Sequence, residues 1–179
     1  MESAALLFRR HGIDGTSFSD VIAHSGAPRG SIYHHFPAGK AQLAAETTQW
    51  AGQFILASTV AALAENDPVG AIEASSRWWT KLLRSSDYEA GCVIAAATVE
   101  GVREPAVRAA AAQAFTDWEK VLAQALRQRG VATPRARSVA TLVVAAIEGA
   151  VILARAQRST EPLLRVTREL QAIVADSMP

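Results

Sequence analysis

The segment from Gly15 to Lys40 carries side chains that can hold phosphate and read the edges of DNA bases. Arg29 can donate two hydrogen bonds to guanine, although an exposed arginine binds phosphate as readily. The Tyr33 hydroxyl suits a phosphate contact, unless its ring is buried instead. Lys40 can place a cation beside a phosphate at a helix start, with simple solvation as the alternative. The predicted DNA-binding residues are Ser17, Arg29, Gly30, Ser31, Tyr33, His34, His35 and Lys40.

Two short helices joined by a tight turn are predicted to position these side chains. Ser17 and Asp20 have the spacing of a capping box, which starts a helix that Gly26 ends. Pro28 suits the first position of the second helix, and Pro37 stops that helix. A helix–turn–helix of this kind places its second helix in the major groove of DNA.

The second short helix is expected to have one apolar face. Ile32 and Phe36 lie four residues apart, and they are predicted to pack against a first helix that contains Ala5, Leu6 and Phe8. The polar side chains on the opposite face are then free to meet a partner. The head is not broadly basic, because residues 1–50 hold equal numbers of basic and acidic side chains and the whole chain has a net charge of +1.

A set of residues in the first quarter of the chain has a characteristic spacing. It comprises Leu7-Phe8, Gly12, Thr16-Ser17, Asp20-Val21, Gly26, Gly30, Tyr33-x-x-Phe36 and Lys40-x-x-Leu43. This set resembles the N-terminal domain of TetR-type transcriptional regulators. The segment from Ala27 to Lys40 is similar, more narrowly, to the LmrA/YxaF-like branch, and Gly91-Cys92 and the tail near residues 150–174 are in keeping with it. The resemblance implies a small-molecule-binding half and a dimer.

Composition predicts an all-α protein. Half of the 179 residues are hydrophobic, alanine is abundant, and alternating β-branched runs are few. We expect a DNA-binding domain at 1–46 and a ligand-binding and dimerisation domain at 47–179. Long helices are predicted at about 40–65, 68–85, 92–100, 105–129, 134–158 and 161–176, where proline often starts and glycine often ends a helix.

The single cysteine and the apolar segment 139–154 indicate in which cellular compartment the protein is expected. One cysteine makes no internal disulfide, and no secretory signal opens the sequence. The apolar segment is shorter than the ~20 residues that a membrane-spanning helix needs. We therefore predict a cytoplasmic protein without a membrane partner.

The last two predicted helices each carry an apolar stripe. The stripes are Val139, Leu142, Val143, Ala146, Ile147, Ala150 and Leu153 on one helix, and Leu163, Val166, Leu170 and Ile173 on the other. Two such helices from each subunit can form a four-helix bundle. Because a short recognition helix contacts few bases, we favour a homodimer on a palindromic operator over simple core packing.

Aromatic residues in the helical body after the head are candidates for a pocket that binds a small hydrophobic or aromatic ligand. Trp78 and Trp79 are adjacent, so one is expected to face the interior and the other a different surface. Cys92 is favoured as a buried structural residue, and Glu148 is expected either to contact a ligand or partner or to face solvent. The predicted ligand-binding residues are Trp78, Trp79, Cys92, Phe115, Trp118 and Glu148, with Trp50 and Phe54 as further candidates.

Catalytic and metal-binding patterns are missing from the sequence. His34 and His35 are adjacent, so they point apart on a helix, and no close cysteine or carboxylate completes a metal site. No nucleophile elbow or glycine-rich phosphate loop occurs, and no cofactor is expected. The sequence therefore predicts a transcriptional repressor that a small apolar ligand releases from DNA. The alternative is a helical small-molecule-binding or interaction protein without specific DNA binding.

Overall fold

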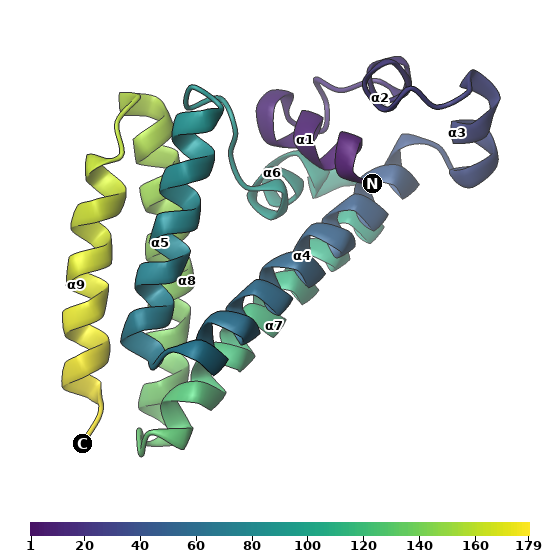
Figure 1. Cartoon of the computed structure of the whole chain (residues 1–179). Helices are drawn as coiled ribbons and strands as arrows, with labels where there is room; N and C mark the ends of the chain where they lie inside the picture. The colour runs from purple at the N-terminus through teal and green to yellow at the C-terminus, as the bar shows by residue number, and fades with distance from the viewer. The chain divides into compact units, whose positions relative to one another are not determined.

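The computed structural model describes residues 1–179, apart from the side chains of Arg29 and Val102. Across this described backbone the chain forms nine α-helices, one short 3₁₀ helix and no strand, which confirms the all-α prediction. The α-helices are α1 (Glu2–His11), α2 (Phe18–Ser25), α3 (Arg29–His35), α4 (Lys40–Glu65), α5 (Pro68–Ser85), α6 (Val93–Glu100), α7 (Pro105–Gln128), α8 (Thr133–Gln157) and α9 (Glu161–Ser177). The predicted ranges of the long helices agree with these bounds to within a residue (Figure 1).

Contacts divide the chain into two compact units. The first comprises Met1–Gln53 and Gly91–Ala114, and the second comprises Phe54–Ala90 and Phe115–Pro179. The chain therefore passes from one unit to the other inside α4 and again inside α7. The division of the chain into functional domains at residue 46 stays a prediction.

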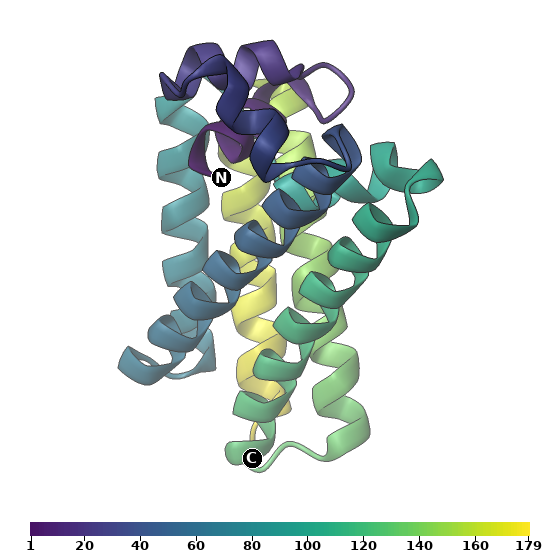
Figure 2. The same ribbon diagram turned by 90° about the vertical axis from the view of Figure 1, so that its right-hand side faces the viewer.

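In the first unit, α1, α2 and α3 gather near the N-terminal end of α4 (Figure 2). Ala4, Ala5 and Phe8 form the buried face of α1. Leu6 is 45% exposed, so its predicted place in the apolar core was wrong. The physical reason is the 3.6-residue repeat of the helix, which sets Leu6 about 200° away from Phe8. Ile32 of α3 is buried as predicted, and Phe36 is half-buried.

Helix α6 belongs to the same unit and packs against α1. The backbone N–H of Gly91 donates to the carbonyl oxygen of Arg9 at 2.8 Å, just before α6 begins. Cys92 is the residue before α6 and is buried. Burial lowers the pKa of the neighbouring Arg9 guanidinium, and the electrostatic interaction with Cys92 acts in the opposite direction.

The second unit is built on α5, α8 and α9, which pack side by side (Figure 1). By length and composition alone, helix α8 is long and apolar enough to cross a membrane. The length of the apolar segment 139–154 therefore does not rule out a membrane-spanning helix, contrary to the expectation from the sequence. Half of its most apolar window is buried inside the protein, and its inner face touches α5 and α9. This is the pattern of a core helix.

The apolar stripe predicted on α8 divides into two sets. Val139, Val143, Ile147 and Ala150 are buried within the protomer. Leu142 and Leu153 are 43% and 48% exposed, and Ile152, which the prediction omitted, is 59% exposed. The first set is therefore core, which corrects the single seven-residue stripe. The second set follows a different line along the helix, because the neighbouring helices cover only one side of α8.

Candidate nucleic-acid interface and ligand pocket

The capping box that starts α2 is fully formed. The Ser17 Oγ accepts a hydrogen bond from the Asp20 backbone N–H at 3.1 Å, and an Asp20 carboxylate oxygen accepts from the Ser17 backbone N–H at 2.7 Å. The Ser17 hydroxyl also donates to that carboxylate at 2.7 Å. The hydrogen bond from the Ser17 side chain lowers the pKa of Asp20, and the backbone hydrogen bond from Ser17 acts in the same direction. Gly26 ends α2 with a left-handed backbone, φ +68°.

Helix α3 follows the turn and begins at Arg29. Pro28 occupies the N-cap, whereas the sequence predicted it at the first helical position, so the helix begins one residue later than predicted. Gly30, Tyr33 and His34 are exposed and fall on one side of α3 at helical spacing. A Cβ at Gly30 would meet nothing within 4 Å, so the backbone is open to an approaching partner. Tyr33 and His34 belong to the polar face that the sequence predicted, whereas Ser31 and His35, which were predicted on the same face, do not lie on this side.

Tyr33 is 63% exposed, and its ring lies edge-on against the ring of Phe18, with centroids 5.4 Å apart. The ring is therefore not buried, and the contact with α2 orients it at the surface. Ser31 and His35 lie on another side of α3, where both line a hollow of about 470 Å³ bounded by α1, α2 and α4. The Arg29 side chain lies outside the described residues, so its predicted contact with DNA stays a prediction.

Lys40 is not simply solvated. Its Nζ donates to the backbone carbonyl of Asp14 at 3.0 Å, which ties the start of α4 to the loop before α2. Gln42 of α4 contacts the end of α3 and the turn that follows it, because its Nε2 donates to the His35 carbonyl at 3.4 Å and its Oε1 accepts from the Ala38 N–H at 3.0 Å. Sequence reasoning missed Gln42, although its position just after a helix start was the available signal.

Glu100 is a second residue that sequence reasoning missed. It lies at the C-terminal end of α6, 86 positions from Asp14, and its Oε2 accepts the Asp14 backbone N–H at 2.8 Å. Gly12 faces the same carboxylate, where a Cβ would lie 2.7 Å from Oε2. No local sequence pattern signals such a contact, because it depends on how α6 packs against α1.

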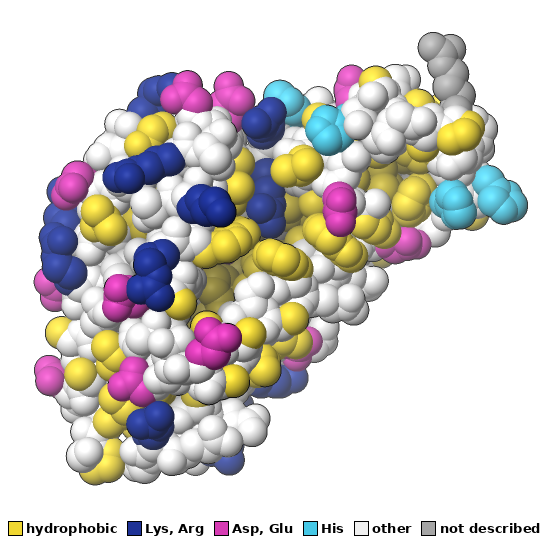
Figure 3. All heavy atoms as spheres, in the orientation of Figure 1, with side chains coloured by type: hydrophobic (Ala, Val, Ile, Leu, Met, Phe, Trp, Pro, Cys, Tyr) yellow, Lys and Arg dark blue, Asp and Glu magenta, His cyan; other side chains and the backbone are white. Residues whose placement is uncertain are grey.

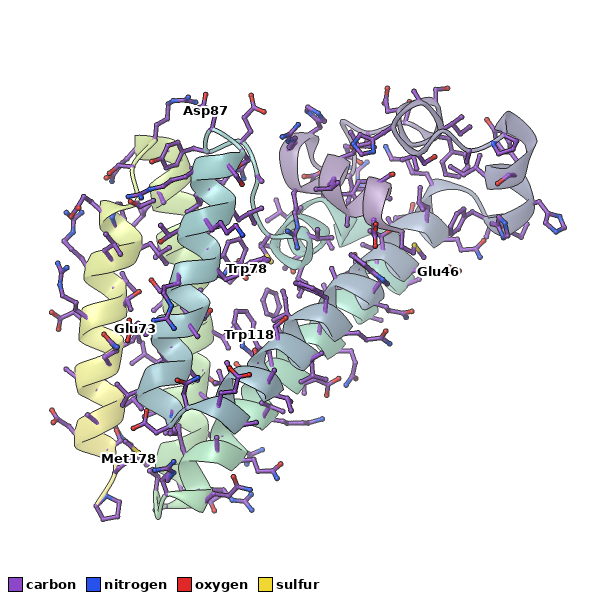
Figure 4. All side chains as sticks on the ribbon, viewed as in Figure 1. Glu46, Glu73, Trp78, Asp87, Trp118 and Met178 are labelled. Carbon is purple, nitrogen blue, oxygen red and sulfur yellow. The ribbon has the colours of Figure 1, made fainter. Side chains whose placement is uncertain are left out.

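A pocket of about 400 Å³ lies within the second unit. It is lined by Phe54, Ile55, Ser58, Thr59, Ala61, Ala62, Glu65 and Asn66, by Ala71, Ile72, Ala74, Ser75, Arg77, Trp78 and Trp79, and by Trp118, Leu122, Val143 and Ile147. Figure 4 shows Trp78 and Trp118 on the same side of α5. Hydrophobic side chains surround the hollow in the face seen in Figure 3. Aromatic walls with few polar groups are typical of sites for small apolar ligands.

The tryptophan pair departs from the prediction. Trp79 is 2% exposed and Trp78 is half-buried, yet both line the same pocket, with ring centroids 4.8 Å apart. Adjacent residues do diverge by about 100° on a helix. The pocket wall, however, extends over a wide arc of α5, and indole rings are long enough to reach it from both positions.

The other predicted pocket residues lie elsewhere. Cys92 belongs to the first unit, and Phe115 and Glu148 are absent from the described lining of this pocket. Glu148 is 8% exposed, so it does not face solvent within the protomer. Phe54 does line the pocket, and its ring centroid is 6.1 Å from that of Trp78. Trp50 lines the hollow in the first unit instead.

His34 and His35 do not form part of a metal site among the described residues. Their ring centroids are 5.7 Å apart. No group of three histidine, cysteine, aspartate or glutamate side chains that could hold a metal ion occurs in the described part of the chain.

Comparison with known families identifies both parts of the chain. Residues 1–47 match the family described as bacterial regulatory proteins of the tetR family. Residues 68–169 match the C-terminal domain of the transcriptional regulators described as LmrA/YxaF-like. The second match covers more than half of the chain.

Individual relatives are similar to this chain along nearly its full length. An HTH-type transcriptional regulator of Mycobacterium tuberculosis strain H37Rv is 39% identical over 99% of this chain and 93% of its own. The HTH-type transcriptional regulator LmrA of Bacillus subtilis is 32% identical over 93% of this chain and 90% of its own. The crystal structure of the regulatory protein TetR from Rhodobacter sphaeroides superposes with a TM-score of 0.86 at 18% identity, covering 96% of this chain and 95% of that one, which shows a shared fold.

A helix–turn–helix head and a helical C-terminal domain on the same chain define a transcriptional regulator. The chain belongs to the TetR family of regulators, with an LmrA/YxaF-like C-terminal domain, as the residue pattern in its first quarter indicated. This family is not enzymatic, which agrees with the absence of catalytic patterns in the sequence.

Proposed function

We propose that the protein is a homodimeric repressor that binds a palindromic operator and leaves it when a small aromatic or apolar molecule occupies the pocket of the second unit. The exposed side of α3, with Gly30, Tyr33 and His34, is the observation that carries the DNA-binding part. Ser17 and Lys40 support it, because Ser17 caps the start of α2 and Lys40 ties the start of α4 to the loop before α2. Such a regulator acts in the cytoplasm, where the DNA is.

Binding to DNA is tested with the chain's own upstream DNA against scrambled DNA of equal length, over a range of salt concentrations. Specific binding that weakens with salt is expected, because cationic contacts to phosphate release counterions. Tyr33→Phe should weaken binding to all sequences alike, whereas Arg29→Ala should relax the preference at one base pair. Equal, weak binding to both DNAs would favour the ligand-binding alternative without specific DNA recognition.

The outer side of α8 is the proposed dimer surface. Leu142, Ile152 and Leu153 are exposed there, and a Cβ at Gly149 would meet nothing within 4 Å in the protomer. Half-exposed Val166 and Ile173 of α9 lie on a common side at helical spacing and extend this apolar surface. Two protomers joined here can present two α3 helices about 34 Å apart, the spacing of successive major grooves on one DNA face.

Gly149→Arg tests this surface without filling space inside the protomer. We expect the variant to keep its helical content and to sediment as a monomer, because a long cation then stands on the surface that must approach its copy. A dimer that survives this substitution at the same protein concentration would place the interface elsewhere.

The pocket is proposed to bind the effector. Its volume lies within the range of ligand sites, about 300–1,000 Å³, and three tryptophans and Phe54 favour a flat aromatic molecule. The apolar dye 8-anilino-1-naphthalenesulfonate serves as a probe. Trp118→Ala should weaken dye binding, whereas Trp50→Ala, outside this pocket, should leave it unchanged. Equal effects of the two substitutions would overturn the assignment.

Release of DNA requires that the effector prefers one state of the protein. A ligand with equal affinity for both states shifts nothing, however tightly it binds. Phe54 lines the pocket and is the residue at which α4 enters the second unit, so the backbone of α4 gives a covalent route between pocket and head. A ligand that binds the free and the DNA-bound protein equally would refute regulation by release.

A further inference from the structure

A second hollow in the second unit lies between α5 and α9 and differs in character from the aromatic pocket. Its volume is about 480 Å³. It is lined by Glu73, Ser76, Arg77, Thr80, Lys81 and Arg84 of α5, and by Leu164, Thr167, Arg168 and Gln171 of α9. We call it the α5–α9 groove. Ten residues line it, and only Leu164 of these is hydrophobic.

Positive charge dominates the lining. Arg77, Lys81 and Arg84 follow one another at i, i+4 and i+7 on one side of α5, and Arg168 adds a fourth cation from α9. Like charges at this spacing repel each other on a helix. The one acidic side chain of the described lining, Glu73, is already engaged, since its Oε1 pairs with Arg77 at 2.6 Å.

Three of the cations, Lys81, Arg84 and Arg168, have no acidic partner among the described residues. The positions three and four residues away from Lys81 hold Arg77, Trp78, Arg84 and Ser85, so its own helix offers it no carboxylate. The side chains of Lys81 and Arg168 are exposed and can turn towards a bound anion.

Hydroxyl groups lie behind the cations. The Thr167 hydroxyl is buried and already paired, because it donates to the Leu163 carbonyl oxygen at 2.7 Å and lies within hydrogen-bond distance of Ser76 Oγ, at 2.8 Å. Thr80 Oγ1 is different, since it is buried and has no hydrogen-bond partner among the described residues. A buried hydroxyl without a partner is costly, and an acceptor in the groove would remove that cost once the side chain turns towards it.

The groove is separate from the two surfaces that the proposed function uses. Figure 4 shows Glu73 on the α9 side of α5, and Trp78 and Trp118 on the opposite side. On α9, Leu164, Arg168 and Gln171 lie on one flank, whereas Val166 and Ile173 of the proposed dimer surface lie about 160–200° away around the helix. A dimer through α8 and α9 therefore leaves the groove open. Basic side chains gather on this face in Figure 3, with acidic ones among them.

We propose that the α5–α9 groove binds a small anion that carries two or more phosphate groups. Such an anion offers many acceptor oxygens and multiple negative charges within a few ångströms, which matches several cations around one hydroxyl. Lys81 and Arg168 bind it from the two helices, Arg84 contributes from the end of the groove, and Thr80 donates a hydrogen bond. This inference does not rest on operator binding or on the effector pocket.

Inorganic pyrophosphate is the probe, and isothermal titration calorimetry on the full chain is the assay. The wild type should bind one pyrophosphate per protomer at low salt, with an affinity that falls as salt rises. The variant Lys81→Gln/Arg168→Gln should bind about tenfold or more weakly, since two charge-assisted contacts are lost. Thr80→Val, which keeps the charge and the shape, should weaken binding about threefold. Arg77 is left intact because it also lines the aromatic pocket.

The matched control is Arg129→Gln/Arg137→Gln, which removes two exposed cations outside the groove and gives the same net charge. It should keep the wild-type affinity to within about twofold. Far-UV circular dichroism confirms that each variant is folded.

Three results would overturn the proposal. The first is no saturable binding by the wild type, and the second is equal weakening in the groove variant and its control, which would indicate a general charge effect. The third is groove-dependent binding to phosphatidylglycerol vesicles without pyrophosphate binding, because it would assign the cations to a membrane surface.

Discussion

Gly12→Ala tests the contact between α6 and the loop before α2. Gly12 has φ +76° and ψ 174°, a region that is essentially restricted to glycine and costs other residues about 1–3 kcal/mol. A Cβ there would also lie 2.7 Å from Glu100 Oε2 and 2.9 Å from Glu100 Cδ, so the carboxylate must move. That movement breaks its hydrogen bond with the Asp14 N–H, which contributes about 1–2 kcal/mol at this exposed position.

The two costs add to a loss of about 3 kcal/mol in the free energy of unfolding. Urea unfolding followed by circular dichroism measures it, at equal protein concentration because the stability of an oligomer depends on concentration. Gly26→Ala is the matched control. Gly26 also has a positive φ, +68°, but a Cβ there meets nothing within 4 Å, so only the backbone cost of about 1 kcal/mol applies.

Glu100→Ala completes a double-mutant cycle. Removing the carboxylate costs the hydrogen bond, yet it also removes the obstacle to a Cβ at position 12. The double variant should therefore lose at least about 1 kcal/mol less than the sum of the single variants. The reasoning fails if Gly12→Ala costs no more than Gly26→Ala, or if the two substitutions at Gly12 and Glu100 are simply additive.

Three further outcomes follow from other contacts. Because hydrogen bonds from Ser17 lower the folded pKa of Asp20, the stability that its carboxylate contributes is present above the unfolded pKa of about 3.9 and is lost as pH falls through the folded pKa. Asp20→Asn should flatten the pH dependence of the free energy of unfolding between about pH 5 and about pH 2, and an unchanged profile would contradict this. Thr167→Val should lower the free energy of unfolding in urea by about 1–3 kcal/mol, since buried Ser76 loses its hydrogen-bond partner. Adding Ser76→Ala should restore part of that loss, and no recovery would show that this hydrogen bond does not contribute to stability. Trp79→Ala should cost about 3–5 kcal/mol because the ring is 2% exposed, and half-buried Trp78→Ala should cost clearly less in the same assay; equal losses would refute the burial argument.

The sequence by itself determined the helices and the turn between α2 and α3. Ser17 and Asp20 cap α2, Gly26 ends it, and Pro68 begins α5, because these signals act over a few residues of backbone and need no distant partner. Spacing in the same segment was also enough for the family, since the glycines and aromatic residues stand where a helix–turn–helix requires them.

Only the tertiary structure decided which side of each helix is covered. Periodicity found the apolar residues of α8 but not the division between buried Val143 and exposed Leu142, because neighbouring helices cover one side alone. Glu100 meets Asp14 across 86 positions, and Trp78 joins Trp79 in one pocket, for the same reason. Contacts between distant segments depend on how the helices pack, and a local pattern carries no information about that packing.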